Sequence, residues 1–491
     1  MFKVRLTDIL NNIEAIQVLG NPEDVLIQKI SVNSQDVEEN TCFIAITGFR
    51  VDAHKFIPEV IARKVPAIVI EKNDFPDEIF TRNNVVKILV KDTRKALAEI
   101  SNAFYGFPSR KLVLTGITGT KGKTTTTYLL KSIYETANIK SGLIGTIKNH
   151  TGKSEKKAKL TTPESLELNE MFASMLNEGI THCVMEVSSH SLSLKRVHGL
   201  DFDFAGFTNL ASDHLDFYKT REKYFDAKKI LFDELKKNAF AIVNADDEFS
   251  EKIVANTKAK VVTFGKKNSS DFQIENIEFD LSGTRFGLIF KGEKVNLETN
   301  LIGEFNAYNA TLAFIVAYLQ NIPVPVIVRG IKEASRVPGR FEVIEGNGKI
   351  VIIDYSHTAG SLEQALISLK KIVAGKKKIF TVFGAGGDRD KTKRPEMGKV
   401  AEKYSDKVFV TSDNPRTEDP EKIIQDILAG MNKNSVYVNP DREESIKTAL
   451  SEADEKTVVL IAGKGHEDYQ EINGIRKHFS DKEIAEKYLN E

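Results

Sequence analysis

The chain has 491 residues, which at roughly 150 residues a domain is enough for about three domains. Lysine plus arginine and aspartate plus glutamate each number 69, so the formal charge of zero argues against the basic footprint of a nucleic-acid-binding protein. Two cysteines, and no apolar run near the roughly 20 residues of a membrane span, exclude disulfide-rich and transmembrane proteins and leave a cytoplasmic multidomain enzyme as the simplest expectation.

Residues 1–110 are expected to form a small α/β unit. Its strands are predicted at 42–48, 67–71 and 85–90, where β-branched and apolar residues run together. A helical pattern at 97–106 ends at a glycine.

Residues 111–336 are expected to form a second unit, a mostly parallel sheet of βαβ units. Its strands are predicted at 111–119, 182–189, 202–210, 240–247 and 259–265, and its helices at 123–138 and 306–320. Residues 270–303 alternate apolar and polar side chains and are expected to form short antiparallel strands that close the unit.

Residues 337–491 are expected to form a third unit, after a turn-rich hinge at 337–341. Its strands are predicted at 349–357, 377–387, 407–414, 435–439 and 456–465. Polar and glycine-rich motifs follow four of these strands, at 354–357, 384–389, 413–416 and 463–467. Because ligands of open parallel sheets bind outside the carboxyl ends of the strands, these four loops are expected to face one ligand.

A glycine-rich loop separates the strand at 111–119 from the helix at 123–138. In residues 119–124, GTKGKT, backbone amides could approach phosphate oxygens, Lys123 could reach the outer phosphates and the Thr124 hydroxyl could hold Mg²⁺. The usual pattern has a glycine where Ile117 stands, and the alternative is an ordinary strand–helix turn. The order of strand, Gly-Lys-Thr and helix favours nucleotide binding.

Two strand ends carry groups that could hold a metal ion. Glu186 lies in the segment MEVSSH and His214 in TNLASDHLD. Since Mg²⁺ prefers oxygen ligands, residue type alone favours the carboxylate over the histidine. Lys228 lies on a helical pattern beside Lys229, and residue type alone predicts a surface lysine.

The motifs taken together resemble one family along the whole chain. GITGTKGKTTT (116–126) resembles the ATP loop of the Mur ligases and the folylpolyglutamate synthetases, ATP-dependent ligases that join an amino acid to a carboxylate. TTPE (161–164), EVSSH (186–190), DHLD (213–216), DNPR (413–416) and GKGHEDYQ (463–470) extend the resemblance to Mur ligases of the MurE type. The resemblance implies an α/β protein of three domains: a small nucleotide-sugar domain (1–110), a central P-loop domain (111–336) and a C-terminal Rossmann-like domain (337–491).

The resemblance implies ATP and Mg²⁺ as cofactors. The ATP-binding residues that it implies are Gly119, Thr120, Lys121, Gly122, Lys123, Thr124, Thr125, Asn309, Arg340, Asp354 and His357. The implied catalytic residues are Lys123, Glu186, His214 and Lys228, and the implied metal-site residues are Thr124, Glu186, His214 and Lys228, with Lys228 carbamylated. A compatible interpretation of the segment around Asn309 is that Asn306 caps a helix and Asn309 lies in its first turn.

The resemblance also implies UDP-N-acetylmuramoyl-L-alanyl-D-glutamate as the acceptor. The residues implied to bind it are Ser34, Thr161, Thr162, Ser188 and Arg196. Gln35 and Leu194 stand where the family commonly has arginine and glutamine. On residue type alone, Thr162 and Pro163 could simply be the cap and first position of a helix.

For the third unit, the resemblance implies meso-2,6-diaminopimelate as the incoming amino acid. The residues implied to bind it are Arg389, Asp413, Asn414, Pro415, Arg416, Gly463 and Glu467. A guanidinium can hold the distal carboxylate, which lysine lacks, with two parallel hydrogen bonds, and an acidic side chain suits the distal ammonium. On residue type alone, Arg416 could instead pair with Glu418 or Asp419.

The activity that the resemblance implies is the ATP-dependent addition of diaminopimelate to the D-glutamyl γ-carboxylate through an acyl phosphate. This is a cytoplasmic step of peptidoglycan precursor synthesis, which involves neither nucleic acid nor membrane insertion. The alternatives are the same ligation with L-lysine, a non-catalytic nucleotide-binding regulator on the same fold, and a kinase that phosphorylates a stable acceptor.

Overall fold

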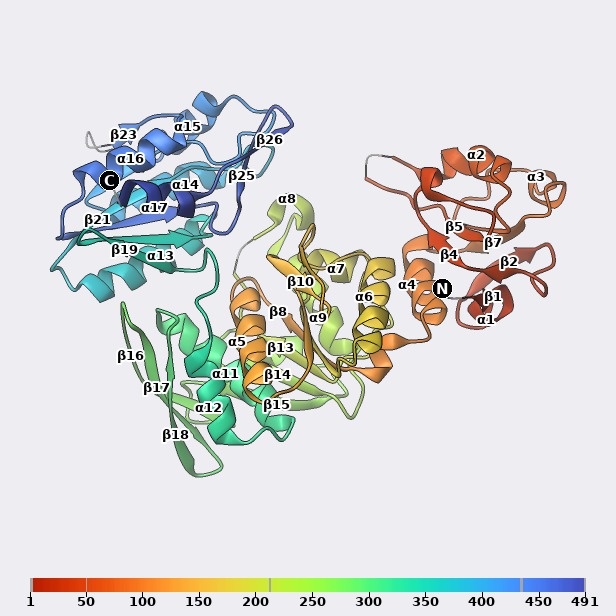
Figure 1. Cartoon of the computed structure of the whole chain (residues 1–491), viewed down its shortest axis with the longest axis horizontal. Helices are drawn as coiled ribbons and strands as arrows, with labels where there is room; N and C mark the ends of the chain where they lie inside the picture. Colours follow the sequence, from red (N-terminus) through yellow and green to blue (C-terminus); the bar gives the residue numbers. More distant parts are fainter. Residues whose placement is uncertain (1–2, 50, 212, 433–435, 490–491) are drawn as a thin grey trace.

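The computed structural model places three groups of elements around three separate sheets (Figure 1). It describes residues 3–49, 51–211, 213–432 and 436–489. Within these residues the main sheets have 5, 11 and 6 strands, beside two small two-stranded sheets. The predicted α/β class is confirmed, while the exact boundaries at 110/111 and 336/337 stay predictions.

The N-terminal unit is a five-stranded sheet in the order β2-β7-β6-β5-β4. Its elements are β1 (Val4–Arg5), α1 (Leu6–Leu10), β2 (Ala15–Leu19), β3 (Leu26–Ile27), β4 (Lys29–Ser31), η1 (Ser34–Asp36), β5 (Thr41–Ile44), η2 (Ala53–Phe56), α2 (Ile57–Ala62), β6 (Ala67–Ile70), α3 (Glu78–Thr81), β7 (Val86–Val90) and α4 (Thr93–Phe104). Helix α4 begins four residues before the predicted start because the Asp92 side chain accepts hydrogen bonds from the amides of Arg94 and Lys95.

The central unit is built on the largest sheet. Its elements are η3 (Pro108–Lys111), β8 (Val113–Thr118), α5 (Lys123–Thr136), β9 (Ser141–Ile144), β10 (Lys148–His150), β11 (Glu155–Lys157), α6 (Ser165–Asn177), β12 (His182–Glu186), α7 (Ser189–Ser193), β13 (Phe204–Phe207), α8 (Leu215–Tyr218), α9 (Arg221–Asp233), β14 (Phe240–Asn244), α10 (Ser250–Ile253), β15 (Lys260–Gly265), β16 (Phe272–Asp280), β17 (Gly283–Phe290), β18 (Glu293–Thr299), α11 (Glu304–Leu319) and α12 (Val324–Glu333). The strand order β9-β12-β8-β13-β14-β15 is parallel throughout, as predicted.

Helices cover both faces of this parallel sheet. One face packs on α5, α11 and α12 through a core that includes Leu130, Ile242 and Phe314. The other face packs on α6, α7 and α9 through Phe172 and Phe232. The sheet is therefore buried on both sides, and its ligand site must lie at the strand ends.

The segment 270–303 forms the antiparallel strands β16, β17 and β18, as predicted. These strands have nine, eight and seven residues, so they are longer than expected. They extend the central sheet beyond β15 rather than closing a separate layer.

The C-terminal unit is a six-stranded sheet in the order β19-β20-β24-β21-β22-β23. Its elements are β19 (Glu342–Gly346), β20 (Lys349–Asp354), α13 (Ala359–Val373), β21 (Lys378–Phe383), α14 (Lys393–Tyr404), β22 (Lys407–Val410), α15 (Pro420–Leu428), β23 (Val436–Val438), α16 (Arg442–Glu452), β24 (Thr457–Ala462), β25 (Tyr469–Ile472), β26 (Ile475–His478) and α17 (Asp481–Leu489). In the six-stranded sheet all strands except the antiparallel edge strand β19 are parallel, while β25 and β26 form a separate antiparallel pair. The first residue of the strand predicted at 435–439 lies outside the described residues.

Strands that precede the predicted site motifs end earlier than expected. β12 ends at Glu186, β20 at Asp354 and β22 at Val410. The polar residues that follow leave the hydrogen-bond ladder and form loops at the carboxyl edge of their sheets. The four motifs of the C-terminal unit consequently follow β20, β21, β22 and β24, at one edge of one sheet.

Candidate active site

The phosphate loop joins β8, a central strand of the large sheet, to α5. Gly119 has a φ of 144° and Gly122 a φ of 89°, a backbone conformation that favours glycine. A Cβ on Gly122 would lie 2.4 Å from Oδ1 of Asn309, so the loop and α11 are in close contact. The Lys123 ammonium folds over the loop and donates to the carbonyl oxygens of Gly119 (2.9 Å) and Thr120 (3.2 Å).

Some loop amides are already engaged by the segment that follows β13. The Thr120 amide donates to the Asn209 carbonyl (2.8 Å), and the Lys121 amide donates to Oδ1 of Asn209 (3.0 Å). Gly122, which precedes α5, has no side chain that could cap the first turn of the helix. The amides of that turn, at Lys123, Thr124 and Thr125, are thus the better candidates to meet an anion.

Glu186 lies at the end of β12 and is 1% exposed. Its carboxylate accepts hydrogen bonds from the Thr124 hydroxyl (3.0 Å), the Thr146 amide (2.8 Å) and the Thr146 hydroxyl (3.0 Å). A Cβ on Gly145 would lie 2.5 Å from Oε1 of Glu186, so only glycine fits beside the carboxylate. The structure thus brings together two oxygen groups predicted to hold a metal ion, and adds Thr146, which sequence reasoning missed.

Lys228 is not the surface lysine that residue type predicts. It lies on α9, is 1% exposed, and its ammonium donates to the Gly119 carbonyl (3.0 Å) under the phosphate loop. It also lies over the Tyr224 ring, 4.5 Å from the centroid. Burial, and then the positive charge of Lys123, lower the pKa of Lys228 well below its usual range. The lowered pKa of Lys228 favours the neutral amine, which is the nucleophile that carbamylation requires.

His214 is more exposed than Thr124, Glu186 and Lys228, the other three residues predicted to hold a metal ion. Its side chain is 43% exposed and its φ is 55°. The ring lies edge-on to His190 (4.7 Å between centroids) and Tyr224 (6.0 Å). Among the described residues, no three His, Cys, Asp or Glu side chains gather into a group that could hold a metal ion.

A network of polar side chains connects the residues predicted to bind the acceptor. The Thr161 hydroxyl lies 3.1 Å from the Thr146 hydroxyl, and the Thr162 hydroxyl donates to the Glu186 carbonyl (2.8 Å). The Ser188 amide donates to Oγ1 of Thr162 (3.1 Å), and Arg196 donates to the Thr162 carbonyl (3.1 Å).

The alternative interpretation, in which Thr162 and Pro163 start a helix, is wrong, because α6 begins at Ser165 after the cap residue Glu164. Thr162 is therefore free of a capping role and bonds within the site. Ser34 lies apart from this network, as the first residue of η1 in the N-terminal unit.

Asn309 lies on α11 and faces the phosphate loop. Its side-chain amide donates to Oδ1 of Asn306 (3.0 Å), and its Oδ1 lies 3.4 Å from the Thr126 hydroxyl. The prediction that Asn306 caps this helix is wrong: Gly303 is the cap residue, and Asn306 donates instead to the Ile302 carbonyl (2.9 Å). The role of Asn309 beside adenine stays a prediction.

The C-terminal unit reaches the phosphate loop through Arg340. Its Nη2 lies 3.4 Å from the Thr124 hydroxyl, and its guanidinium lies 4.7 Å from the centroid of the Tyr355 ring. Asp354 accepts a hydrogen bond from the Phe341 amide (2.8 Å), which fixes the turn that carries Arg340. The two sheets thus meet at the mouth of the loop.

His357 lies at the same junction. Its Nδ1 is 2.9 Å from the Tyr355 carbonyl. Loss of contact with water, and then the charge of Lys121, lower its pKa to about 3, so the ring is neutral at pH 7. Burial also lowers the pKa of Lys121, to about 8, against the opposing charge of Asp213.

The loops that follow β22 and β24 come together as the sequence predicts. Asn414 donates to Oε2 of Glu467 (2.8 Å) and accepts from the Lys464 ammonium (3.2 Å). Burial and the nearby Asp413 raise the pKa of Glu467. A Cβ on Gly463 would lie 2.5 Å from Oδ2 of Asp413, so the two loops touch at their bases.

Arg416 points toward the loop that follows β21. Its Nη1 donates to the Gly387 carbonyl, and its backbone bonds to Glu471 (2.9 Å) and Asn473 (2.6 Å) near the β25–β26 hairpin. Pro415 packs against the same loop, since its carbonyl would lie 1.9 Å from a Cβ on Gly387.

Arg416 does not pair with Glu418, which was the alternative interpretation of this arginine. The Glu418 carboxylate is held by the buried Arg394 (2.9 Å) and by Lys391 (3.0 Å). The guanidinium of Arg416 therefore keeps its other donors for a ligand. Arg389, the remaining predicted residue, is exposed in the loop after β21.

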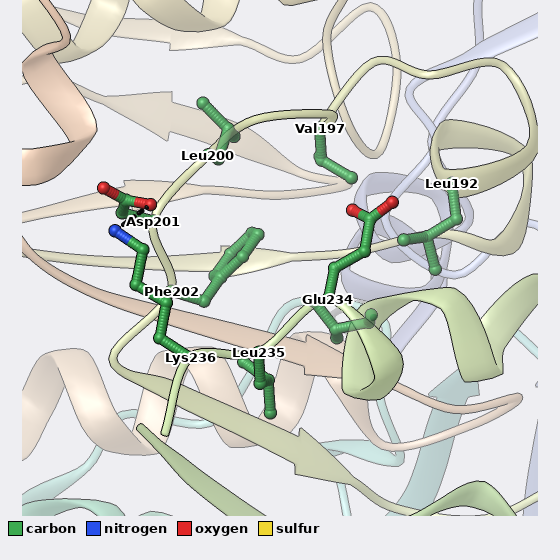
Figure 2. A pocket seen from close by; sticks show the side chains of 9 residues that line it. Leu192, Val197, Leu200, Asp201, Phe202, Glu234, Leu235 and Lys236 are labelled. Carbon is green, nitrogen blue, oxygen red and sulfur yellow. Dashed lines mark ion pairs between the residues drawn. The ribbon is translucent and has the colours of Figure 1, made fainter. Parts of the chain in front are cut away.

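A surface depression on the central unit lies outside the candidate site (Figure 2). Its lining consists of Leu192, Val197, Leu200, Asp201, Phe202, Leu231, Glu234, Leu235 and Lys236. Two of these lining residues, Lys236 and Asp201, form an ion pair of 2.6 Å at one side of it. None of the predicted site residues lines this depression.

Two further site residues were not singled out in the sequence, although Asn209 lies within TNLASDHLD. Thr146 follows the four-residue strand β9, and Asn209 follows β13. Their position directly after parallel strands was the available signal. Among the described residues, no helix has both the length and the apolar composition needed to cross a bilayer.

Family models match the chain in three consecutive stretches. Residues 26–105 match the model described as Mur ligase family, catalytic domain. Residues 117–317 match the Mur ligase middle domain, and residues 339–465 match the model described as Mur ligase, glutamate ligase domain. The stretches follow the same order as the three sheets.

Full-length relatives and solved structures agree with this match. The chain is 41% identical over 492 residues to the UDP-N-acetylmuramoyl-L-alanyl-D-glutamate–2,6-diaminopimelate ligase of Clostridium botulinum, covering 99% of this chain and 100% of that protein. It is 43% identical to the protein of the same name from Aquifex aeolicus, over 94% of each chain. A solved structure of a ligase of that name is 29% identical with a TM-score of 0.70 and covers 100% of this chain and 99% of its own. A MurF ligase from Thermotoga maritima in complex with ADP shares the fold at 20% identity, with a TM-score of 0.64, over 95% of this chain and 99% of its own. The chain belongs to the Mur ligase family.

Proposed function

We propose that this protein is an ATP-dependent ligase that adds meso-2,6-diaminopimelate to the D-glutamyl γ-carboxylate of UDP-N-acetylmuramoyl-L-alanyl-D-glutamate. The observation that carries the proposal is the identity of 41% over 99% of the chain with a protein of that name. The reaction belongs to peptidoglycan precursor synthesis. A cytoplasmic location suits it, because its cosubstrate is ATP and both cysteines, Cys42 and Cys183, are buried free thiols.

The phosphate loop supports ATP as the source of driving force. Lys123 lies over the loop, where phosphate oxygens would replace the carbonyl oxygens of Gly119 and Thr120 as its partners. Arg340 approaches Thr124 from the C-terminal unit and adds a second positive charge. These cations would stabilise the charge that develops on the transferring phosphoryl group.

The oxygen atoms of Thr124 and Glu186 fit Mg²⁺, which takes hard oxygen ligands and keeps several waters and phosphate oxygens. When bound there, Mg²⁺ would offset negative charge on the phosphates. Thr146 keeps the Glu186 carboxylate turned toward Thr124 through its amide and its hydroxyl. A carbamylated Lys228 beneath the loop would add an anionic oxygen group, which remains a separate proposal.

The proposed reaction has two steps, phosphorylation of the acceptor and attack by the amine. The acceptor carboxylate, positioned beside Thr161 and Thr162, attacks the γ-phosphorus, the bond to the bridging oxygen of ADP breaks, and an acyl phosphate forms. The free amine of diaminopimelate attacks the carbonyl carbon, and the tetrahedral intermediate releases phosphate as the C–O bond breaks and the amine loses its proton. Closure of the C-terminal unit over the loop would keep water from the acyl phosphate.

Arg416 and Glu467 support diaminopimelate as the amino acid. Arg416 offers a guanidinium to the distal carboxylate, and Glu467, together with Asn414, offers oxygen atoms to the distal ammonium. L-Lysine has the distal ammonium without the carboxylate, so Arg416 would be left without its anion.

An ADP-release assay with a panel of amino acids tests the proposal. The expected result is turnover with ATP, the UDP-linked acceptor and meso-diaminopimelate, and much weaker turnover with L-lysine. Turnover only with lysine would replace the amino acid in the proposal. The absence of ADP release with every amino acid would overturn the enzymatic function.

A further inference from the structure

A buried guanidinium lies behind the two loops proposed to hold diaminopimelate. Arg442 is the first residue of α16, and its side chain is 0% exposed. Its Nε and Nη2 each donate to the Asp481 carboxylate at 2.7 Å, with Asp481, also 0% exposed, at the start of α17. This bidentate pair belongs to none of the motifs that the sequence analysis singled out.

Two further donors of Arg442 go to the backbone of the two loops. Its Nη1 donates to the Ser412 carbonyl (3.1 Å), the residue before the segment Asp413–Arg416. Its Nη2 donates to the Ala462 carbonyl (3.0 Å), the residue before Gly463. One planar group thus holds the origins of both loops at fixed separation.

The Ala462 carbonyl ends β24 and the Ser412 carbonyl lies just after β22, and these two strands are not neighbours in the sheet. β21 lies between β22 and β24, so no ladder hydrogen bond links the ends of β22 and β24. The chain leaving β22 passes directly over Gly384, where a Cβ would lie 2.3 Å from the Thr411 carbonyl. Arg442 therefore connects the ends of β22 and β24 across β21 through its hydrogen bonds to Ser412 and Ala462.

Charge links the same guanidinium to the proposed site. Asp481, and beyond it Asp413 and Glu467, favour the charged form of Arg442 and raise its pKa despite burial. Asp413 and Glu467 are residues proposed to face diaminopimelate. Arg442 therefore lies close enough to influence both acidic groups without itself lining the site.

We infer that Arg442, held by Asp481, is a positioning residue that sets the spacing of the loops after β22 and β24 and thereby the affinity for the incoming amino acid. The inference rests on the proposed function, because it takes the occupant of these loops to be diaminopimelate. It assigns no contact between Arg442 and the substrate.

The decisive variant is Arg442→Met/Asp481→Leu, which removes both charges and keeps apolar volume in the buried space. Replacing a buried ion pair with apolar residues of similar volume commonly preserves folding. We expect the KM for meso-diaminopimelate to rise by about tenfold or more, because hydrogen bonds from a charged donor to both loops are lost. The KM values for ATP and for the UDP-linked acceptor should stay within about twofold of wild type, since other residues are proposed to hold those substrates.

Arg442→Lys and Ile446→Ala complete the experiment. Arg442→Lys keeps the positive charge but has a single ammonium, which cannot bond to both loops and to Asp481 as the guanidinium does. We expect this variant to raise the KM for diaminopimelate by roughly threefold or more. It tests the inference even if the double variant does not fold. Ile446, one turn further along α16, is 0% exposed in the core of the same unit. Ile446→Ala should lower the melting temperature without changing the KM for diaminopimelate.

The outcomes separate the inference from the proposed function. A wild-type protein that shows no preference for diaminopimelate overturns both. A selective wild type, with a KM for diaminopimelate that is unchanged in either Arg442 variant or raised equally in Ile446→Ala, overturns the inference alone. A rise confined to the KM for diaminopimelate in the Arg442 variants supports it.

Discussion

Substituting Arg416 tests whether one side chain selects diaminopimelate over lysine. Arg416→Ala removes the guanidinium but keeps the backbone bonds to Glu471 and Asn473 that hold the loop. Arg416 already has a φ of 55°, and alanine has no greater cost there than arginine, so the loop should not change its conformation. The variant therefore reports on the lost side chain.

The size of the effect follows from the donors that remain available. Arginine has five N–H donors, and the Gly387 carbonyl takes one of them at Nη1. Two parallel bonds to a carboxylate are then possible, and at about 1.5 kcal/mol each they would contribute about 3 kcal/mol, or roughly 100-fold. Because the side chain is partly exposed, we expect a loss of selectivity of at least about tenfold.

The assay compares kcat/KM for meso-diaminopimelate and for L-lysine by ADP release. Arg476→Ala is the matched control, because Arg476 lies on β26 of the same region and pairs with Glu471 (2.8 Å) at the exposed rim. The control should keep the wild-type selectivity. Unchanged selectivity in Arg416→Ala, or an equal loss in both variants, would refute the role given to the guanidinium.

Three further predictions concern the central unit. Lys228→Gln should lower turnover by roughly 100-fold, because the side chain can no longer be carbamylated. Wild-type protein treated with bicarbonate should carry the added mass of CO₂ at Lys228, and native mass spectra that lack this mass would contradict carbamylation. Gly122→Ala puts a Cβ 2.4 Å from Oδ1 of Asn309 at a φ of 89°, so calorimetric affinity for an ATP analogue should fall by about tenfold, and unaltered affinity would contradict the close contact. The Glu234 carboxylate lies 3.7 Å from Nδ1 of His198 and raises the pKa of this histidine. The stability that the pair adds is therefore fully present below the pKa of histidine in the unfolded chain, about 6.5, and is lost as the pH rises through the pKa of His198 in the folded protein. Chemical unfolding of His198→Gln should show a weaker decline in stability over that pH range, and an identical decline would exclude this pair as its source.

Sequence patterns predicted the parts of the site where chemistry and local structure coincide. The phosphate loop combines a buried strand, two glycines and a helix start within a dozen residues, and each feature favours the others. The DNPR and GKGHE segments follow strands of one parallel sheet, so their convergence followed from topology. Lys228 is the clearest failure of residue type alone, since a lysine with no adjacent acidic motif gave no signal of its burial.

The supporting residues were not predictable for a physical reason. Thr146 holds Glu186 from the loop after β9, 40 residues earlier in the chain, and Arg442 holds Ser412 from a helix 30 residues later. Contacts at such separations depend on the packed arrangement of the sheets, not on any local pattern. The predicted start of a helix was also wrong where another residue is the cap, as Gly303 is for α11 in place of Asn306.

Arg340 links the C-terminal unit to the phosphate loop of the central unit. This residue belongs to the turn before β19, yet it approaches the Thr124 hydroxyl of the phosphate loop. An ion pair between Lys157 of β11 and Asp468, in the segment before β25, joins the same two units at another point. Arg340 brings a cation from the C-terminal unit to the ATP loop, and the same unit carries the loops proposed to bind the amino acid. In the proposed closed state, activation and amine attack would therefore take place in one enclosed site. A phosphorylated acceptor would then form only where the amine is already held nearby, which limits its loss to water.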